Sequence, residues 1–267
     1  MAVTRDAPAE ERMPALLRRL KKAYPEAKIA LTYESPLECV IAVILSAQST
    51  DALVNTVTPG LFAKYKRPED YLAVPEEELQ QDIHATGFFR QKTRSIRGMC
   101  QKLVDDFDGE VPQTMAELVT LPGVARKTAN VVQNNLFPEV ARKDPDAGIA
   151  VDTHVGRVAV RLGLTRWGSK EAVRIEKDLK ELTPRKDWYR ITDLFIDHGR
   201  RICDARRPLC DQCPIEALCP SSQVVGRPDL YRVAPGIKKK TTAKKSTARK
   251  RTVKKTVARK TVRKRKG

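Results

Sequence analysis

The sequence predicts an all-α protein with a disordered, strongly basic C-terminal tail. Through most of residues 13–203, apolar residues recur at the three- and four-residue spacing of amphipathic helices. No run of alternating apolar and polar residues bounded by hairpin turns interrupts this pattern. From residue 238 to the end, the chain has sixteen Lys or Arg and no acidic or aromatic residue, which is too much like charge for a packed core.

The expected helices follow in order along the chain. Residues 13–24 place leucines on one face and basic residues on the other. Ser35 offers an N-cap for a helix over residues 37–46, which is apolar nearly all round and therefore buried. Asp51 can cap the next helix, although Pro59 should kink or end it. Further helical segments are expected over residues 91–107, 114–119, 124–137, 153–162, 170–182 and 188–203.

The formal net charge of +18 is typical of a nucleic-acid binder, but the charge is unevenly distributed. Outside the tail, residues 1–237 hold 35 basic and 33 acidic residues, so nearly all the excess positive charge belongs to the tail. No stretch approaches the ~20 apolar residues of a membrane span, and the N-terminus has no apolar segment of the signal-peptide kind. We therefore expect a cytoplasmic protein whose tail neutralises phosphates.

Four cysteines, Cys203, Cys210, Cys213 and Cys219, follow a C-x6-C-x2-C-x5-C spacing. Four thiolates in a short loop can bind one zinc ion or one cubane iron–sulfur cluster. Structural zinc usually shows two tight pairs, and this loop has only one, so the spacing alone leaves zinc, a cluster and unligated thiols open. Cys39 and Cys100 lie in helical segments and are expected to be small core residues.

A Pro-Gly turn joins two helical segments in the string LPGVARKTA, residues 121–129. Gly123 permits a tight turn, and the N–H groups at the start of the second helix can bind a DNA phosphate regardless of base sequence. Many Pro-Gly turns only connect two helices and bind nothing. Lys127, just inside the second helix, is either a phosphate-gripping lysine or an amine nucleophile whose pKa is lowered by a desolvated cleft and by the cation of Arg126.

A second candidate for catalysis is Asp152 in the string IAVDTH, residues 149–154. It follows three apolar residues and precedes a helix, so a plain N-cap is a complete structural explanation. An acid fixed at that helix start could also assist deprotonation of the lysine and stabilise positive charge at C1′ of a sugar. The two roles are compatible.

These strings resemble the motifs of the endonuclease III family, in the same order, over residues 13–220. The resemblance implies that Lys127 is the nucleophile, that Asp152 is the second catalytic residue and that the cysteine loop holds a [4Fe–4S] cluster. It also implies a set of DNA contacts, in which Gln48 of LSAQSTD and Phe88 of GFFRQK fill the space left by an extruded nucleotide. The remaining implied contacts are to the DNA backbone, from Lys92, the hairpin residues Gly123, Val124, Ala125 and Arg126, and the loop residues Arg206 and Arg207.

The chain departs from the family pattern at two places. Ala125 stands where the family usually has a second glycine in the hairpin, and the polar segment 138–148, which we expect to be a loop, is longer than in family members. The resemblance implies two helical lobes: residues 29–139 with the hairpin, and residues 1–28 with 140–222 around the cluster. Residues 223–267 are expected to be a linker and the disordered tail.

The function implied is that of a bifunctional DNA glycosylase and AP lyase that removes oxidised pyrimidines from double-stranded DNA, as a monomer associated with a bacterial nucleoid. The related adenine glycosylases carry a catalytic Glu shortly before the Gln of the LSAQ-like segment, where this chain has apolar residues 42–45. Mismatch-specific thymine or uracil glycosylases, and a non-enzymatic DNA-binding protein with a cluster, stay open as alternatives.

Overall fold

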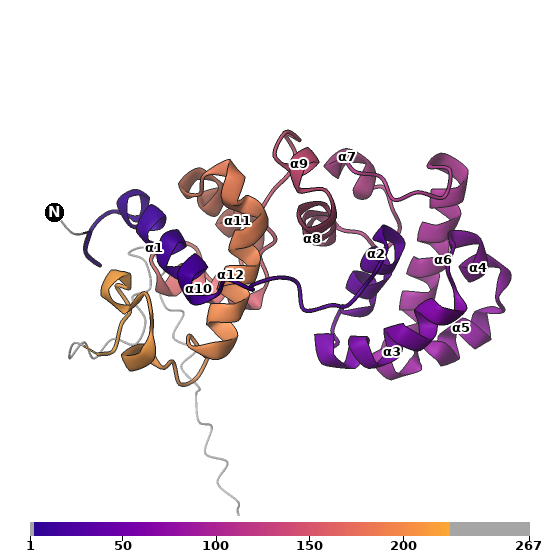
Figure 1. Ribbon diagram of the computed structural model, residues 1–267, viewed down its shortest axis with the longest axis horizontal. Coiled ribbons are helices and arrows are strands. Elements are labelled where there is room, and N and C mark those ends of the chain that lie inside the picture. The colour runs from indigo at the N-terminus through magenta and orange to yellow at the C-terminus, as the bar shows by residue number, and fades with distance from the viewer. Residues whose placement is uncertain (1–2, 225–267) are drawn as a thin grey trace, which may run out of the picture. The chain divides into compact units, whose positions relative to one another are not determined.

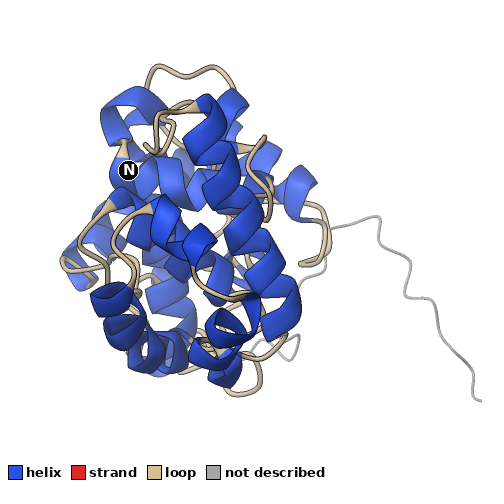
Figure 2. Cartoon of the chain, turned by 90° about the vertical axis from the view of Figure 1, so that its right-hand side faces the viewer, coloured by secondary structure: helices blue, strands red, loops and turns tan. Residues whose placement is uncertain are grey.

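The computed structural model describes residues 3–224, and that range consists of helices joined by turns, with no strand among them (Figure 2). The all-α prediction is confirmed. The tail, predicted from the charge run, lies outside the described residues. Within the described range, no helix has the length and apolar character that crossing a bilayer requires.

The chain forms the following elements before the hairpin: α1 Ala9–Ala23, α2 Pro36–Leu45, α3 Asp51–Lys64, α4 Pro68–Ala73, α5 Glu76–Asp82, η1 His84–Thr86, α6 Phe89–Asp106 and α7 Met115–Leu118. After the hairpin come α8 Arg126–Leu136, α9 Pro138–Ala141, α10 Thr153–Arg161, α11 Ala172–Leu182, η2 Arg185–Asp187, α12 Trp188–Arg201, η3 Cys210–Gln212 and η4 Glu216–Leu218. Figure 1 shows α2 to α6 at one end of this helical region and α1, α10 and α12 at the other.

Two buried hydrophobic clusters lie within the described residues. The first cluster is built from side chains between Leu31 and Val132, on α2 to α8. The second cluster joins the apolar face of α1 to side chains between Ile149 and Leu218, on α10, α11, α12 and the cysteine loop. The expected division into two lobes at residues 28–29 and 139–140 stays a prediction.

Local sequence accounts for several helix starts. Ser35 Oγ accepts a hydrogen bond from the Glu38 N–H, with Pro36 at the first helical position, as predicted for α2. The cap of α3 was predicted wrongly: Thr50 caps it, accepting from the Leu53 N–H, and Asp51 is the first helical residue. The carboxylate of Asp51 is thereby left to pair with Arg200 of α12 at 2.7 Å.

Three further departures have tertiary causes. Helix α3 runs through Pro59 to Lys64, because Leu61 and Phe62 beyond the proline are buried in the first cluster. The short helices α4 and α5, over a segment that was not among the expected helices, bury Tyr71 and Leu79. The segment 138–148 is not wholly a loop, since its first residues form the single turn α9.

Candidate active site

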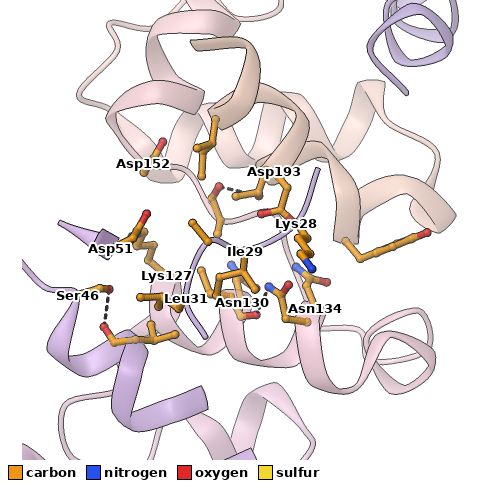
Figure 3. Close-up of a pocket in the computed structure, with 18 of the residues that line it drawn as sticks. Lys28, Ile29, Leu31, Ser46, Asp51, Lys127, Asn130, Asn134, Asp152 and Asp193 are labelled. Carbon is orange, nitrogen blue, oxygen red and sulfur yellow. Dashed lines mark hydrogen bonds between the residues drawn. The ribbon is translucent and has the colours of Figure 1, made fainter. Parts of the chain in front are cut away.

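A pocket of about 100 Å³ lies where α2, α3, α8 and α12 meet the extended segments 28–31 and 150–152. Lys127 and Asp152 both line it, so the structure brings the two catalytic candidates to one cavity (Figure 3). Residues that the sequence analysis did not single out also line it, namely Lys28, Asn130, Asn134, Tyr189, Thr192 and Asp193. The pocket is polar on several walls, as a site that receives a nucleotide requires.

Lys127 occupies the second position of α8 and its side chain is exposed. Within residues 3–224, its ammonium group makes no hydrogen bond or ion pair. A lysine held by no partner can approach a substrate carbon without first breaking an interaction. The position therefore suits a nucleophile as well as a phosphate contact.

The hairpin turn before α8 depends on Gly123. Its φ is +81°, and a Cβ there would lie 2.7 Å from Cβ of Ser95, so only glycine fits. Ala125 is the N-cap of α8 in an extended conformation, and no side chain caps the first turn. The N–H groups at the start of α8 are therefore available to an anion. Val124 is buried, which leaves only its backbone for any such contact.

Arg126, the neighbouring cation that we expected beside Lys127, is paired with a carboxylate. Its guanidinium donates to both oxygens of Glu176 on α11, at 2.9 and 3.3 Å, and it does not line the pocket. The carboxylate offsets part of the Arg126 charge, and the effect of Arg126 on Lys127 stays a prediction. The pair instead joins the hairpin helix to α11, with the amide of Asn130 donating to the same carboxylate at 3.2 Å.

Asp152 is the N-cap of α10, so the structural role expected for it is present. Its Oδ1 accepts from the N–H groups of His154 and Val155, each at 2.8 Å. The other oxygen, Oδ2, has no hydrogen-bond partner in the described part of the chain. One oxygen thus fixes the carboxylate while the other is available to the pocket, which makes capping and catalysis compatible.

Asp193 of α12 is a pocket residue that the sequence did not reveal. In Figure 3 it lies close to Lys28, between Asp152 and Asn134. Burial raises the pKa of its carboxyl to about 7; the charge of Asp197 adds to the rise and that of Arg190 opposes it. In a sequence, an acid at the border of an apolar helix face is usually interpreted as exposed to solvent. The pocket position of Asp193 is therefore visible only in the folded structure.

Replacing Asp193 by Asn is expected to flatten the dependence of stability on pH. An unfolded aspartate loses its proton near pH ~4, whereas the pKa of folded Asp193 is about 7. The folded chain therefore binds more protons in that window, and the wild-type free energy of unfolding falls as the pH rises. Between pH 5 and 7 the fall attributable to this group is on the order of 2 kcal/mol. Urea titrations of wild type, Asp193→Asn and the surface control Asp105→Asn measure it, and equal slopes for all three would contradict it.

Gln48 and Phe88, the candidates for entering the DNA, share an unusual backbone. Both are exposed, Phe88 by 63 %, and both have left-handed conformations, with φ of 54° and 49°. Non-glycine residues in this region are uncommon and often mark functional sites. An exposed aromatic ring on a strained loop tip is consistent with insertion between bases, and not with a position in the core.

Lys92 does not occupy the position that we predicted. Only 4 % of it is exposed, and its Nζ donates to the carbonyl oxygens of Leu45 and Thr86 at 2.7 and 2.8 Å. A buried ammonium with two short hydrogen bonds is not available to a phosphate, so we correct its assignment as a DNA-backbone contact.

The four cysteines of the C-terminal loop line one small cavity, together with Leu162, His198 and Ile202. Burial raises the pKa of Cys219 to about 11 and that of Cys213 to about 12. Thiols in such surroundings ionise when a metal binds them. As they stand, no set of three or more His, Cys, Asp or Glu side chains in residues 3–224 converges on a single ion.

The backbone of this loop is held by arginines of α10. Arg161 donates to the carbonyl oxygens of Cys203, Asp204 and Ala205, at 3.1, 2.6 and 2.8 Å. The backbone N–H groups of Arg206 and Arg207 donate to Asp204 Oδ1, while their side chains are exposed and make no hydrogen bond or ion pair with described residues. Both guanidinium groups are therefore available to phosphate.

Comparison with known proteins agrees with this geometry. Residues 41–185 match the HhH-GPD superfamily of base excision DNA repair proteins. The endonuclease III of Synechocystis is 48 % identical over 217 residues, covering 81 % of this chain and 95 % of that protein.

Two solved structures share the fold at high identity. A non-covalent endonuclease III–DNA complex superposes with a TM-score of 0.73 at 44 % identity, covering 80 % of this chain and 96 % of the other. A trapped covalent endonuclease III–DNA intermediate gives 0.74 at 43 % identity, covering 83 % of this chain and 100 % of the other. The chain therefore belongs to the endonuclease III family, within the HhH-GPD superfamily, and is a DNA glycosylase of base excision repair.

Proposed function

We propose that this protein is a bifunctional glycosylase and AP lyase that acts on oxidised pyrimidines in double-stranded DNA. The observation that carries the proposal is the shared pocket of Lys127 and Asp152, which gives an amine and a carboxylate access to one extruded nucleotide. Relatives of the chain have been solved both bound to DNA and covalently trapped on it, which supports DNA as the substrate and an amine nucleophile as the catalyst.

The chemistry assigned to these two residues proceeds in two stages. Neutral Lys127 Nζ attacks C1′ of the damaged nucleotide, the N-glycosidic bond breaks and the base leaves with its electron pair. Asp152 Oδ2 stabilises the positive charge that develops at C1′ and accepts the proton from the lysine nitrogen. Asp152 returns that proton to O4′ as the C1′–O4′ bond breaks and the sugar opens to an iminium, while the departed base takes a proton from water. Water accepts the C2′ proton, and the 3′ phosphate leaves with the electrons of the C3′–O bond. Hydrolysis of the iminium by water then frees Lys127 and leaves an unsaturated aldehyde on the DNA.

DNA binding in this proposal uses the hairpin and the cysteine loop. The uncapped N-terminus of α8 binds one phosphate through backbone N–H groups, and the free side chains of Arg206 and Arg207 bind others. Such contacts position the duplex without reading its sequence, which suits an enzyme that must search all DNA for damage. The monomer and the nucleoid setting expected from the sequence belong to this same proposal.

The test of the function is the product that the wild-type enzyme makes from a duplex with one thymine glycol. We expect the free base to be released together with strand cleavage 3′ to the lesion. Base release without cleavage would indicate a glycosylase without lyase activity. Excision confined to undamaged thymine or uracil in mismatches would replace oxidised pyrimidines as the substrate, and no excision with tight binding would indicate a non-enzymatic DNA-binding protein.

We further propose that Cys203, Cys210, Cys213 and Cys219 hold a [4Fe–4S] cluster. The donor set fits, because four thiols from one short loop line one cavity. Bound there, the cluster supplies a structural cross-link that fixes the loop carrying Arg206 and Arg207. In this role the cluster does not contact the reacting sugar, because Lys127 and Asp152 line a separate pocket.

Protein purified from iron-rich cells is expected to be yellow-brown, with a broad absorbance near ~400 nm and about four iron atoms per chain. Cys203→Ser should lower both the iron content and the melting temperature. Cys100 is buried in the first hydrophobic cluster, and Cys100→Ala should leave the iron content unchanged. Iron and zinc are measured together by elemental analysis. Stoichiometric zinc in place of iron would overturn the cluster assignment.

A further inference from the structure

Lys92 is a buried lysine whose ammonium group, among residues 3–224, has two carbonyl partners and no carboxylate. Lysines are rarely buried unless paired, because removing the charge from water costs free energy. Desolvation by burial lowers the pKa of the amine, and only 4 % of the residue is exposed. Because burying the charge costs free energy, we expect Lys92 to stabilise a local structure that the fold or the function requires.

Both of its partners are the last residues of helical elements. Leu45 ends α2 and Thr86 ends η1, and Nζ of Lys92 lies 2.7 Å and 2.8 Å from their carbonyl oxygens. Carbonyls at a helix C-terminus lack partners within the helix and carry the negative end of its dipole. One ammonium on α6 thus serves the ends of two elements that are 41 residues apart in the sequence.

The segments that follow these two carbonyls carry the two DNA-entering candidates. Gln48 comes three residues after Leu45, and Phe88 comes two residues after Thr86. In residues 3–224, only Gln48, Phe88 and Asp108 combine a side chain with a positive φ. Such a conformation costs about 1–2 kcal/mol at each non-glycine residue and persists only where the surroundings hold it.

We propose that Lys92 is a positioning residue that couples these two loops, so that Gln48 and Phe88 enter the DNA together. Lys92 on helix α6 binds both carbonyl oxygens and so fixes the distance between the starts of the two loops. The exposed loop tips stay available to contact the DNA. The inference rests on the proposed function, because it assigns the loops to the extrusion of a damaged nucleotide. It adds that extrusion depends on a residue that itself touches no DNA.

The test compares substrates that do and do not require extrusion. Lys92→Met keeps an unbranched apolar side chain only one heavy atom shorter but removes the donors, and Lys102→Met on the same helix α6 is the surface control. We expect Lys92→Met to lower kcat/KM on a thymine-glycol duplex by roughly tenfold or more, a size typical of small misplacements around an active site. Borohydride trapping on a single-stranded abasic oligonucleotide, which needs no extrusion, should change less than about twofold.

A double-mutant cycle separates positioning from general stability. If Lys92 acts through the loop tips, Lys92→Met should cost little more in a Phe88→Ala background, so that the two effects are strongly non-additive. Fluorescence of 2-aminopurine beside the lesion should likewise report reduced unstacking in Lys92→Met. Lys92→Arg, whose several N–H donors can serve two carbonyls, should restore part of the duplex activity, and it takes the place of Lys92→Met if that variant does not fold.

Two results would overturn the inference: equal losses on duplex and single-stranded substrates, or additive effects of the two substitutions. They are distinguishable from failure of the proposed function. If wild type neither cleaves the lesion duplex nor is trapped on the abasic strand, the function itself is wrong. If wild type does both and Lys92→Met matches it throughout, only the role of Lys92 is wrong.

Discussion

Replacing Lys127 by Gln is expected to abolish the covalent complex that borohydride traps on thymine-glycol DNA. The iminium needs a primary amine at C1′, and a carboxamide cannot form it. Because Lys127 is exposed and has no partner in the described structure, the substitution should change the free energy of unfolding by no more than about 0.5 kcal/mol. The measurement is a gel under denaturing conditions that separates free DNA from the cross-linked complex.

The matched control is Lys28→Gln, since Lys28 lines the same pocket. It should still be trapped, although its affinity for DNA can fall with the lost charge. Undiminished trapping by Lys127→Gln would show that another amine is the nucleophile, and proteolysis of the trapped complex would then identify it. Loss of trapping in both variants would indicate that the pocket binds DNA through its charge and not through one reactive amine.

Replacing Asp152 by Asn is expected to lower the single-turnover rate of excision by about 10²–10⁴, the range usual for a positioned acid–base group. Binding to a lesion duplex should be largely kept. The asparagine oxygen can still accept from the N–H groups of His154 and Val155, so the cap of α10 survives the change. The variant therefore removes the charge at Oδ2 while keeping the local structure.

Asp152→Ser is the companion variant, because serine also caps helices but carries no carboxylate. Both variants should be similarly slow. A normal excision rate with only a lower melting temperature would show that Asp152 is a cap and nothing more. Thermal unfolding and single-turnover kinetics on the same preparations distinguish these outcomes.

The periodicity of apolar residues predicted the long amphipathic helices, because each of them buries one face and that face repeats every three or four residues. Helices α6, α8 and α12 lie within two residues of their expected ends at most positions. The pattern was weakest where context decides: α9 is a single turn opened by Pro138, and the two-turn α4 is stabilised by burying Tyr71. Neither segment is long enough for a helical period to be read from its sequence.

The motifs likewise identified Lys127 and Asp152 as candidates, but they did not predict which residues surround them. Glu176 lies 50 residues from Arg126, and nothing in either local sequence indicates that they pair. Lys92 was misassigned for the same reason, because a lysine beside an exposed loop looks solvated until the two carbonyls that receive it are located. Burial of charge is a property of the assembled fold.

The position of α1 has a consequence for the order in which the chain folds during synthesis. The first cluster draws on residues between Leu31 and Val132, so it can close soon after α8 has left the ribosome. Helix α1 is made earlier, yet its buried face, including Met13, Leu16 and Leu20, packs against residues from Ile149 onward. That apolar face therefore stays exposed while nearly half of the protein is synthesised. The few long-range contacts that finally cover it make the second cluster the slower part to form and the part most dependent on protection from aggregation.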